Sequence, residues 1–108
     1  MKKINTVIVT RRSDYGNDAP LVYPCDSMEN AIKLKEALSE RFLKEFGRTR
    51  EEFKNDKLVY DLEEDNRHFS VKALYSCEDF IVTIEEKLLV EDNDIDKVVE
   101  DAFSLSSI

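Results

Sequence analysis

The stretch that decides the fold runs from residue 57 to residue 90 and reads KLVYDLEEDNRHFSVKALYSCEDFIVTIEEKLLV. Apolar and polar residues alternate in three blocks, 57–62, 68–77 and 80–90, with short polar segments between them. A period of two predicts β-strands that bury one face, and short connections predict antiparallel neighbours. These blocks therefore predict a meander of three antiparallel strands.

One face of each expected strand carries the apolar residues. The inward positions are Leu58, Tyr60 and Leu62, then Phe69, Val71, Ala73, Tyr75 and Cys77, then Phe80, Val82, Ile84, Leu88 and Val90, with Glu86 as the exception.

Two more strands and a helix are expected before this meander. β-Branched residues in 4–10 predict a buried strand, a turn-rich segment follows at 12–20, and 21–25 returns as a second strand. A helix then begins at Asp26 or Ser27 and ends at Gly47, with an apolar stripe at helical spacing. Because a helix alone cannot bury such a stripe, this helix is expected to lie on the sheet.

A second helix is expected at the C-terminal end. It follows Asp92-Asn93-Asp94 and carries apolar residues at i, i+3, i+4, i+7 and i+8: Ile95, Val98, Val99, Ala102 and Phe103. The fold class is therefore α+β, with a mostly antiparallel sheet of four to five strands and the order β-β-α-β-β-β-α. Both helices are expected on one face of the sheet, against one core, and the other face is expected to be wet.

Length and composition indicate one acidic domain over residues 1–108. A chain of 108 residues is large enough for one core and too small for two. The net charge of −8 is uneven: the first 54 residues carry a net charge of +2 and the last 54 carry −10. An uneven charge distribution affects how fast a protein associates with its partners, but it does not specify a fold.

Motifs for catalysis and cofactors are missing or incomplete. With only two glycines, Gly16 and Gly47, the chain has no glycine-rich phosphate loop. Asp92, Asp94 and Asp96 match the start of an EF-hand calcium loop, but Lys97 stands where that loop needs glycine and Phe103 where it needs glutamate. These acids are expected to cap a helix, and no cofactor or metal is expected.

His68 is the only histidine, so a histidine-dependent enzyme has to use it. Cys77 would point to the opposite face of the same strand, whereas Cys25 remains open as a nucleophile partner. An exposed histidine without a catalytic role is the expected interpretation. The two cysteines are too few for a disulfide framework and are expected to be reduced.

The sequence predicts a cytoplasmic protein that does not bind membranes or nucleic acid directly. No segment approaches the ~20 apolar residues of a membrane span. Basic residues surround the end of the first helix, but glutamates are interleaved with them and the chain is acidic. These bases are Arg41, Lys44, Arg48, Arg50 and Lys54, and the glutamates are Glu40, Glu45, Glu51 and Glu52.

The leading functional hypothesis is a non-enzymatic acidic binding protein. Six carboxylates are the candidate partner-binding residues: Asp61, Glu63, Glu64, Asp65, Glu85 and Glu86. Such a surface resembles a phosphate backbone to a basic protein. The expected partner is therefore a protein with a basic site, and nucleic-acid-binding sites are among the sites of this kind. In kind, this is similar to small acidic inhibitors such as nuclease immunity proteins and DNA mimics.

An alternative is a small homodimeric interaction module that uses the exposed sheet face. Leu74, Ile81 and Leu89 are apolar residues expected on that face, where together they would form a contact patch.

Overall fold

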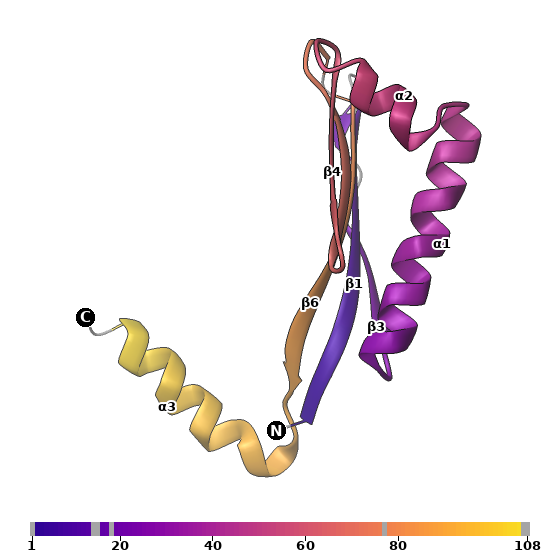
Figure 1. Ribbon diagram of the computed structural model, residues 1–108. Coiled ribbons are helices and arrows are strands. Elements are labelled where there is room, and N and C mark those ends of the chain that lie inside the picture. The colour runs from indigo at the N-terminus through magenta and orange to yellow at the C-terminus, as the bar shows by residue number, and fades with distance from the viewer. Residues whose placement is uncertain (1, 14–15, 18, 77, 107–108) are drawn as a thin grey trace.

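A computed structural model describes residues 2–13, 16–17, 19–76 and 78–106. Six strands, three α-helices and a short 3₁₀ helix make up this part of the chain (Figure 1). In chain order they are β1 (Lys2–Ser13), β2 (Gly16–Asn17), β3 (Leu21–Cys25), α1 (Met28–Phe46), α2 (Arg50–Asn55), β4 (Tyr60–Asp65), β5 (His68–Ala73), β6 (Asp79–Leu89), η1 (Asp92–Asp94) and α3 (Ile95–Ser106).

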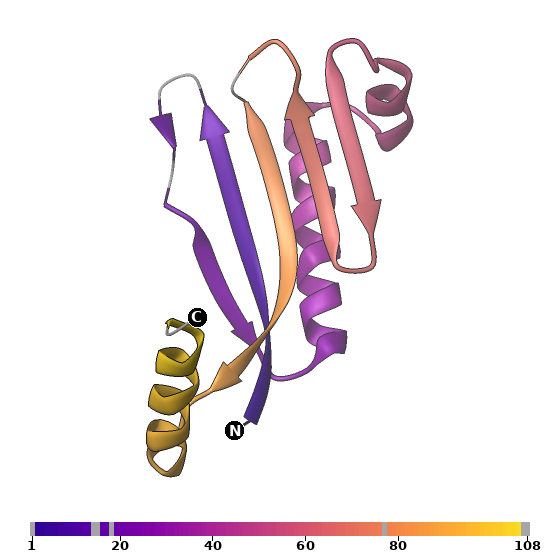
Figure 2. The ribbon, with the colours of Figure 1, turned by 90° about the vertical axis from the view of Figure 1, so that its left-hand side faces the viewer.

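All pairs of neighbouring strands in the sheet are antiparallel. The strand order is β2-β1-β6-β5-β4, and β3 also pairs with β1. The longest ladder joins β1 to β6, from Lys2 opposite Leu89 to Arg12 opposite Asp79. Figure 2 shows β1, β6, β5 and β4 side by side, with α1 behind them. The predicted α+β class, element order and three-stranded meander are confirmed, with the short helix α2 and the two-residue strand β2 as additional elements.

Helix α1 begins and ends where the sequence predicts. The Ser27 hydroxyl accepts a hydrogen bond from the Asn30 amide at 3.1 Å, which satisfies one of the free donors of the first turn. Gly47 adopts the left-handed conformation with φ of 81°, which glycine tolerates without strain, and its amide donates to the Leu43 carbonyl.

The core lies between the sheet and the helices α1 and α2, which cover the same face (Figure 1). On α1, the line of residues closest to the sheet contains Lys35 and the small Ser39, whose hydroxyl donates to the Lys35 carbonyl. The buried apolar residues are Val7, Val9, Ala31, Leu43, Phe53, Phe69, Val71, Phe80, Val82 and Ile84.

Helix α2 is absent from the predicted element order and changes the strand after it. Thr49 and Glu52 form a capping box that starts α2, and Phe53 is fully buried. The chain then turns through residues 56–59, where the amides of Val59 and Tyr60 donate to the Asp56 carbonyl. The expected strand 57–62 is therefore shifted to β4, and the prediction that Leu58 faces inward is wrong.

The outer parts of the meander are also more exposed than predicted. β5 ends at Ala73, so Tyr75 lies beyond it and is exposed, while Cys77 lies outside the described residues. Leu88 and Val90, predicted to face the core, are exposed because β6 continues past the part of the sheet that α1 covers.

Helix α3 has the predicted amphipathic pattern, but the prediction that it packs on the same core is wrong. Figure 1 shows α3 projecting from the end of β6, on the side of the sheet opposite α1. It packs against η1 rather than against the sheet, and Ile95 and Val99 are 48% and 49% exposed. The sequence shows which face of a helix is apolar but not what the helix contacts.

The projecting helix makes the molecule elongated. The radius of gyration is 17.4 Å, whereas a compact chain of this length has a value of about 13 Å. Among the described residues, no helix is both long and apolar enough to cross a membrane.

Candidate functional site

The six candidate carboxylates do not lie on one surface. On β4, Asp61, Glu63 and Asp65 point to the open face of the sheet, because the alternate residues Leu62 and Glu64 face the helices. The same alternation on β6 places Glu85 on the open face and Glu86 on the helix-covered face. Strand geometry therefore places four of the six predicted residues on the open face and two, Glu64 and Glu86, on the helix-covered face.

Glu64 belongs to a compact ion-pair cluster that links α1, α2 and β4. Arg50 donates from Nε and Nη2 to the two carboxylate oxygens of Glu64, at 2.8 and 3.0 Å, and from Nη1 to Glu40 at 2.6 Å. The Arg50 guanidinium also lies 3.7 Å from Glu36 and 5.8 Å from the centre of the Phe69 ring. Glu64 therefore has a structural partner within the chain.

Two further candidates also have internal partners. Lys3 lies 3.2 Å from Glu86, and Lys87 lies 2.7 Å from Glu85. Both pairs are largely exposed, so each contributes little to stability. They nevertheless reduce the negative charge that this part of the sheet presents to a partner.

The bidentate hydrogen bonds from Arg50 lower the pKa of Glu64 below its ordinary value. A carboxyl group whose pKa is lower in the folded state stabilises the fold above its unfolded pKa, and this contribution is lost as pH falls through the folded pKa. The pair is three-quarters buried but reachable by solvent, so we expect it to contribute about 1 kcal/mol or less.

Neutralising Glu64 is expected to produce a pH-dependent loss of stability. At pH 7, Glu64→Gln should unfold at a lower urea concentration than wild type, by up to about 1 kcal/mol, and the difference should shrink towards pH ~3 as the wild-type carboxylate protonates. Glu63→Gln is the matched control, because Glu63 is the exposed neighbour on the other face. Equal, pH-independent losses in both variants would contradict the assignment.

The remaining acids form a short row on the edge strand β4. Asp61, Glu63 and Asp65 are alternate residues, so the row spans about 13 Å. The Asp65 carboxylate accepts the Arg67 amide at 2.8 Å, and Lys72 is the cross-strand neighbour of Asp61. This row is the part of the predicted site that stays together on the open face.

The segment formed by η1 and α3 carries a larger share of the negative charge. Residues 91–101 contain six acidic residues and one lysine, which gives a net charge of −5. The side of the sheet from which α3 projects is the same open side that Asp61, Glu63 and Asp65 face (Figure 1). Of these acids, Asp92, Asp94 and Asp96 were predicted to cap the helix, and none was among the candidate partner-binding residues. An exposed amphipathic helix is a common protein-binding element.

A nucleophile pair of Cys25 and His68 is excluded by the sheet. Two strands, β1 and β6, separate β3 from β5. Cys25 shares the helix-covered face with its neighbour Asn5, whereas His68 shares the open face with Thr83, whose hydroxyl lies 3.4 Å from its Nδ1 atom. Cys25 is a free thiol that donates to the Tyr23 carbonyl.

The apolar residues expected to form a patch on the open face do not meet. Leu74 lies beyond the end of β5, and Ile81 and Leu89 are eight residues apart on β6, a distance of about 27 Å. Across the strands, Ile81 is flanked by Thr10 and Ser70. Within the part of the chain that the structure covers, no group of three or more histidine, cysteine or carboxylate residues is placed to hold a metal ion.

Comparison with protein-family models, with curated proteins and with solved structures finds no match to this chain.

Proposed function

We propose that this protein is a non-enzymatic binding protein that engages a basic partner protein, with α3 as the main contact. The observation that carries the proposal is that α3 projects from the domain with an apolar stripe exposed beside acidic residues. A preformed amphipathic helix is a common protein-recognition element, because its apolar side fits a groove while its polar side meets the groove's rim. In this proposal, the negative charge of residues 91–101 selects a groove with a basic rim.

The acidic row on β4 supports the same partner. It faces the side of the sheet on which α3 lies, so one basic surface can meet both (Figure 1). Carboxylates distributed over a helix and a strand edge resemble the phosphates that a nucleic-acid-binding site contacts. An inhibitor that occupies such a site is the role that this charge distribution fits best.

Two variants of α3 distinguish the contribution of its apolar stripe to partner binding from the contribution of its charge. Val99→Asp puts a charge into the exposed stripe, and Asp101→Lys reverses a charge beside it. Because both positions are exposed and distant from the core, the free energy of unfolding should change by less than about 0.5 kcal/mol. The matched controls are Leu58→Asp, at a site 79% exposed on the opposite end of the molecule, and Glu51→Lys on α2.

The proposal is tested by affinity capture, with the 108-residue chain as bait and extracts of the source cells as the supply of partners. We expect Val99→Asp to abolish capture of a basic protein, Asp101→Lys to weaken it, and both controls to retain it. Capture should also weaken as the salt concentration rises, since exposed charges are screened. Retention by Val99→Asp, salt-independent capture, or capture only of a second copy of this chain would overturn the proposal.

A further inference from the structure

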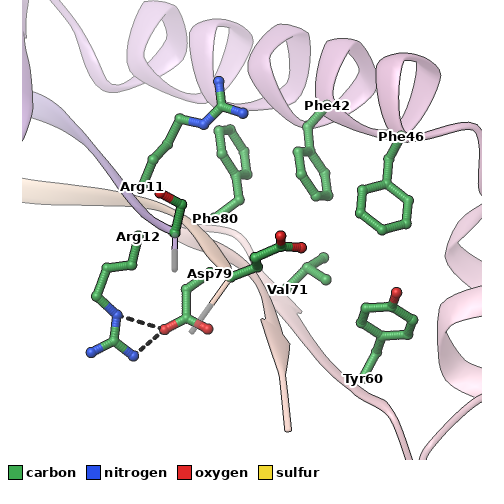
Figure 3. A pocket seen from close by; sticks show the side chains of 10 residues that line it. Arg11, Arg12, Phe42, Phe46, Tyr60, Val71, Asp79 and Phe80 are labelled. Carbon is green, nitrogen blue, oxygen red and sulfur yellow. Dashed lines mark hydrogen bonds and ion pairs between the residues drawn. The ribbon is translucent and has the colours of Figure 1, made fainter. Parts of the chain in front are cut away.

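A pocket at the far end of the sheet from α3 is lined by aromatic side chains. Its volume is about 540 Å³, within the range of small-molecule sites. Phe42 and Phe46 reach it from the last turns of α1, and Tyr60, Val71 and Phe80 reach it from β4, β5 and β6 (Figure 3). Residues 11–13 of β1 complete the lining, so four strands and one helix build a single site.

Rings at the edge of the aromatic core form the walls of this pocket. Phe42 and Phe80 are stacked, with ring centres 4.5 Å apart and planes 2° from parallel. Phe46 meets Tyr60 edge to face at 5.8 Å, and Phe46 is 40% exposed. Phe80 is only 7% exposed, so Phe46 is the wall most open to water. A flat apolar guest that covers Phe46 removes apolar surface from solvent and allows ring stacking.

A cation lies at one side of these walls. The Arg11 guanidinium is 5.9 Å from the centre of the Phe80 ring, and Figure 3 shows Phe80 between Arg11 and Phe42. The side chain is exposed, and among the described carboxylates none forms an ion pair with it. The charge of Arg11 helps to lower the pKa of Glu45, although less than the hydrogen bond from Arg41 does. The neighbouring Arg12 is instead held by Asp79 through two hydrogen bonds, so Arg11 is the cation left for a ligand.

We infer that this pocket binds a small aromatic carboxylate. Its ring would lie against the aromatic walls and its carboxylate would face Arg11, whose planar guanidinium suits bidentate recognition of such a group. Glu78 also lines the pocket and is exposed, so its charge opposes an anionic ligand. The site lies at the end of the molecule opposite α3 and is independent of the proposed partner contact.

Binding of naphthalene-2-carboxylate, compared with naphthalene-2-methanol, tests this inference. Both are fluorescent, and because the chain contains no tryptophan, ligand emission can be followed with little protein background. We expect the carboxylate to bind more tightly than the alcohol. Amide chemical shifts should change at Arg11 and in the last turn of α1, which would locate the ligand in the pocket.

Three variants of exposed residues make the test specific. Arg11→Gln should weaken carboxylate binding about tenfold and leave alcohol binding unchanged, while Glu78→Gln should tighten carboxylate binding. Arg67→Gln is the matched control, since Arg67 is an exposed arginine in the distant β4–β5 turn. Equal affinity for the two ligands, no binding, an unchanged affinity in Arg11→Gln, or an equal loss in Arg67→Gln would overturn the inference.

Discussion

Replacing Phe53 by alanine is expected to lower the free energy of unfolding by about 3–5 kcal/mol, the usual cost of removing a fully buried ring. Phe53 is the only fully buried residue of α2. Its ring packs against Phe42, Phe46 and Tyr60, with centres 5.1–6.3 Å apart. The loss therefore combines the transfer of the ring to water with an unfilled cavity between α1, α2 and β4.

Urea unfolding followed by circular dichroism measures this loss. Natural domains have only about 5–15 kcal/mol of stability, so the alanine substitution removes a large part of it. Phe53→Leu leaves a smaller cavity, is expected to cost less than the alanine substitution, and keeps the comparison measurable. Leu58→Ala is the control, because Leu58 is exposed in the turn that follows α2. A cost below 1 kcal/mol for Phe53→Ala would show that α2 is not part of the core.

Replacing Lys35 by alanine is expected to cost about 2–3 kcal/mol. Lys35 is 1% exposed, although it is a lysine in the middle of α1. Its Nζ atom donates to the Asp65 carbonyl at 2.7 Å and lies 3.0 Å from a Glu36 carboxylate oxygen. Truncation removes a buried aliphatic stem and the hydrogen bond that ties α1 to the last residue of β4.

Replacing Lys35 by methionine shows how much of the stability loss comes from packing and how much from the hydrogen bond. Lys35→Met retains most of the buried volume and avoids burying an ammonium group, so its cost should stay below about 1.5 kcal/mol. Lys33→Ala, on the exposed side of the same helix, should change stability by less than about 0.5 kcal/mol. If Lys35→Ala and Lys33→Ala were equivalent in chemical denaturation, the buried position of Lys35 would be wrong.

Local sequence signals predicted much of this fold. The bounds of β3, the Ser27 cap and the Gly47 end of α1 follow from residue chemistry acting within a few positions, and the meander follows from alternation. The capping box of α2, Thr49 to Glu52, was also readable, but a helix of six residues shows too little periodicity to stand out.

Features that depend on contacts between residues far apart in the sequence could not be predicted. The buried stripe of α1 was predicted from its apolar residues, yet its most buried residues include Lys35 and Ser39. Lys35 donates to the Asp65 carbonyl at the end of β4, and Ser39 donates to the Lys35 carbonyl within the helix. The amphipathic pattern of α3 gave no information about its direction. The candidate acids were chosen for proximity in sequence, and strand alternation then placed Glu64 and Glu63 on opposite faces.

The pairing of β1 with β6 also determines when this chain can fold during synthesis. β1 can pair with β3 early, because a short segment joins them. The other edge of β1 stays unpaired until residues 79–89, which form β6, have been synthesised. Closing such a long loop is slow, and an unpaired strand edge is prone to association with other chains. Residues up to Leu89 must therefore leave the ribosome before the sheet is complete, and α3 emerges only after its attachment point on β6 has been made.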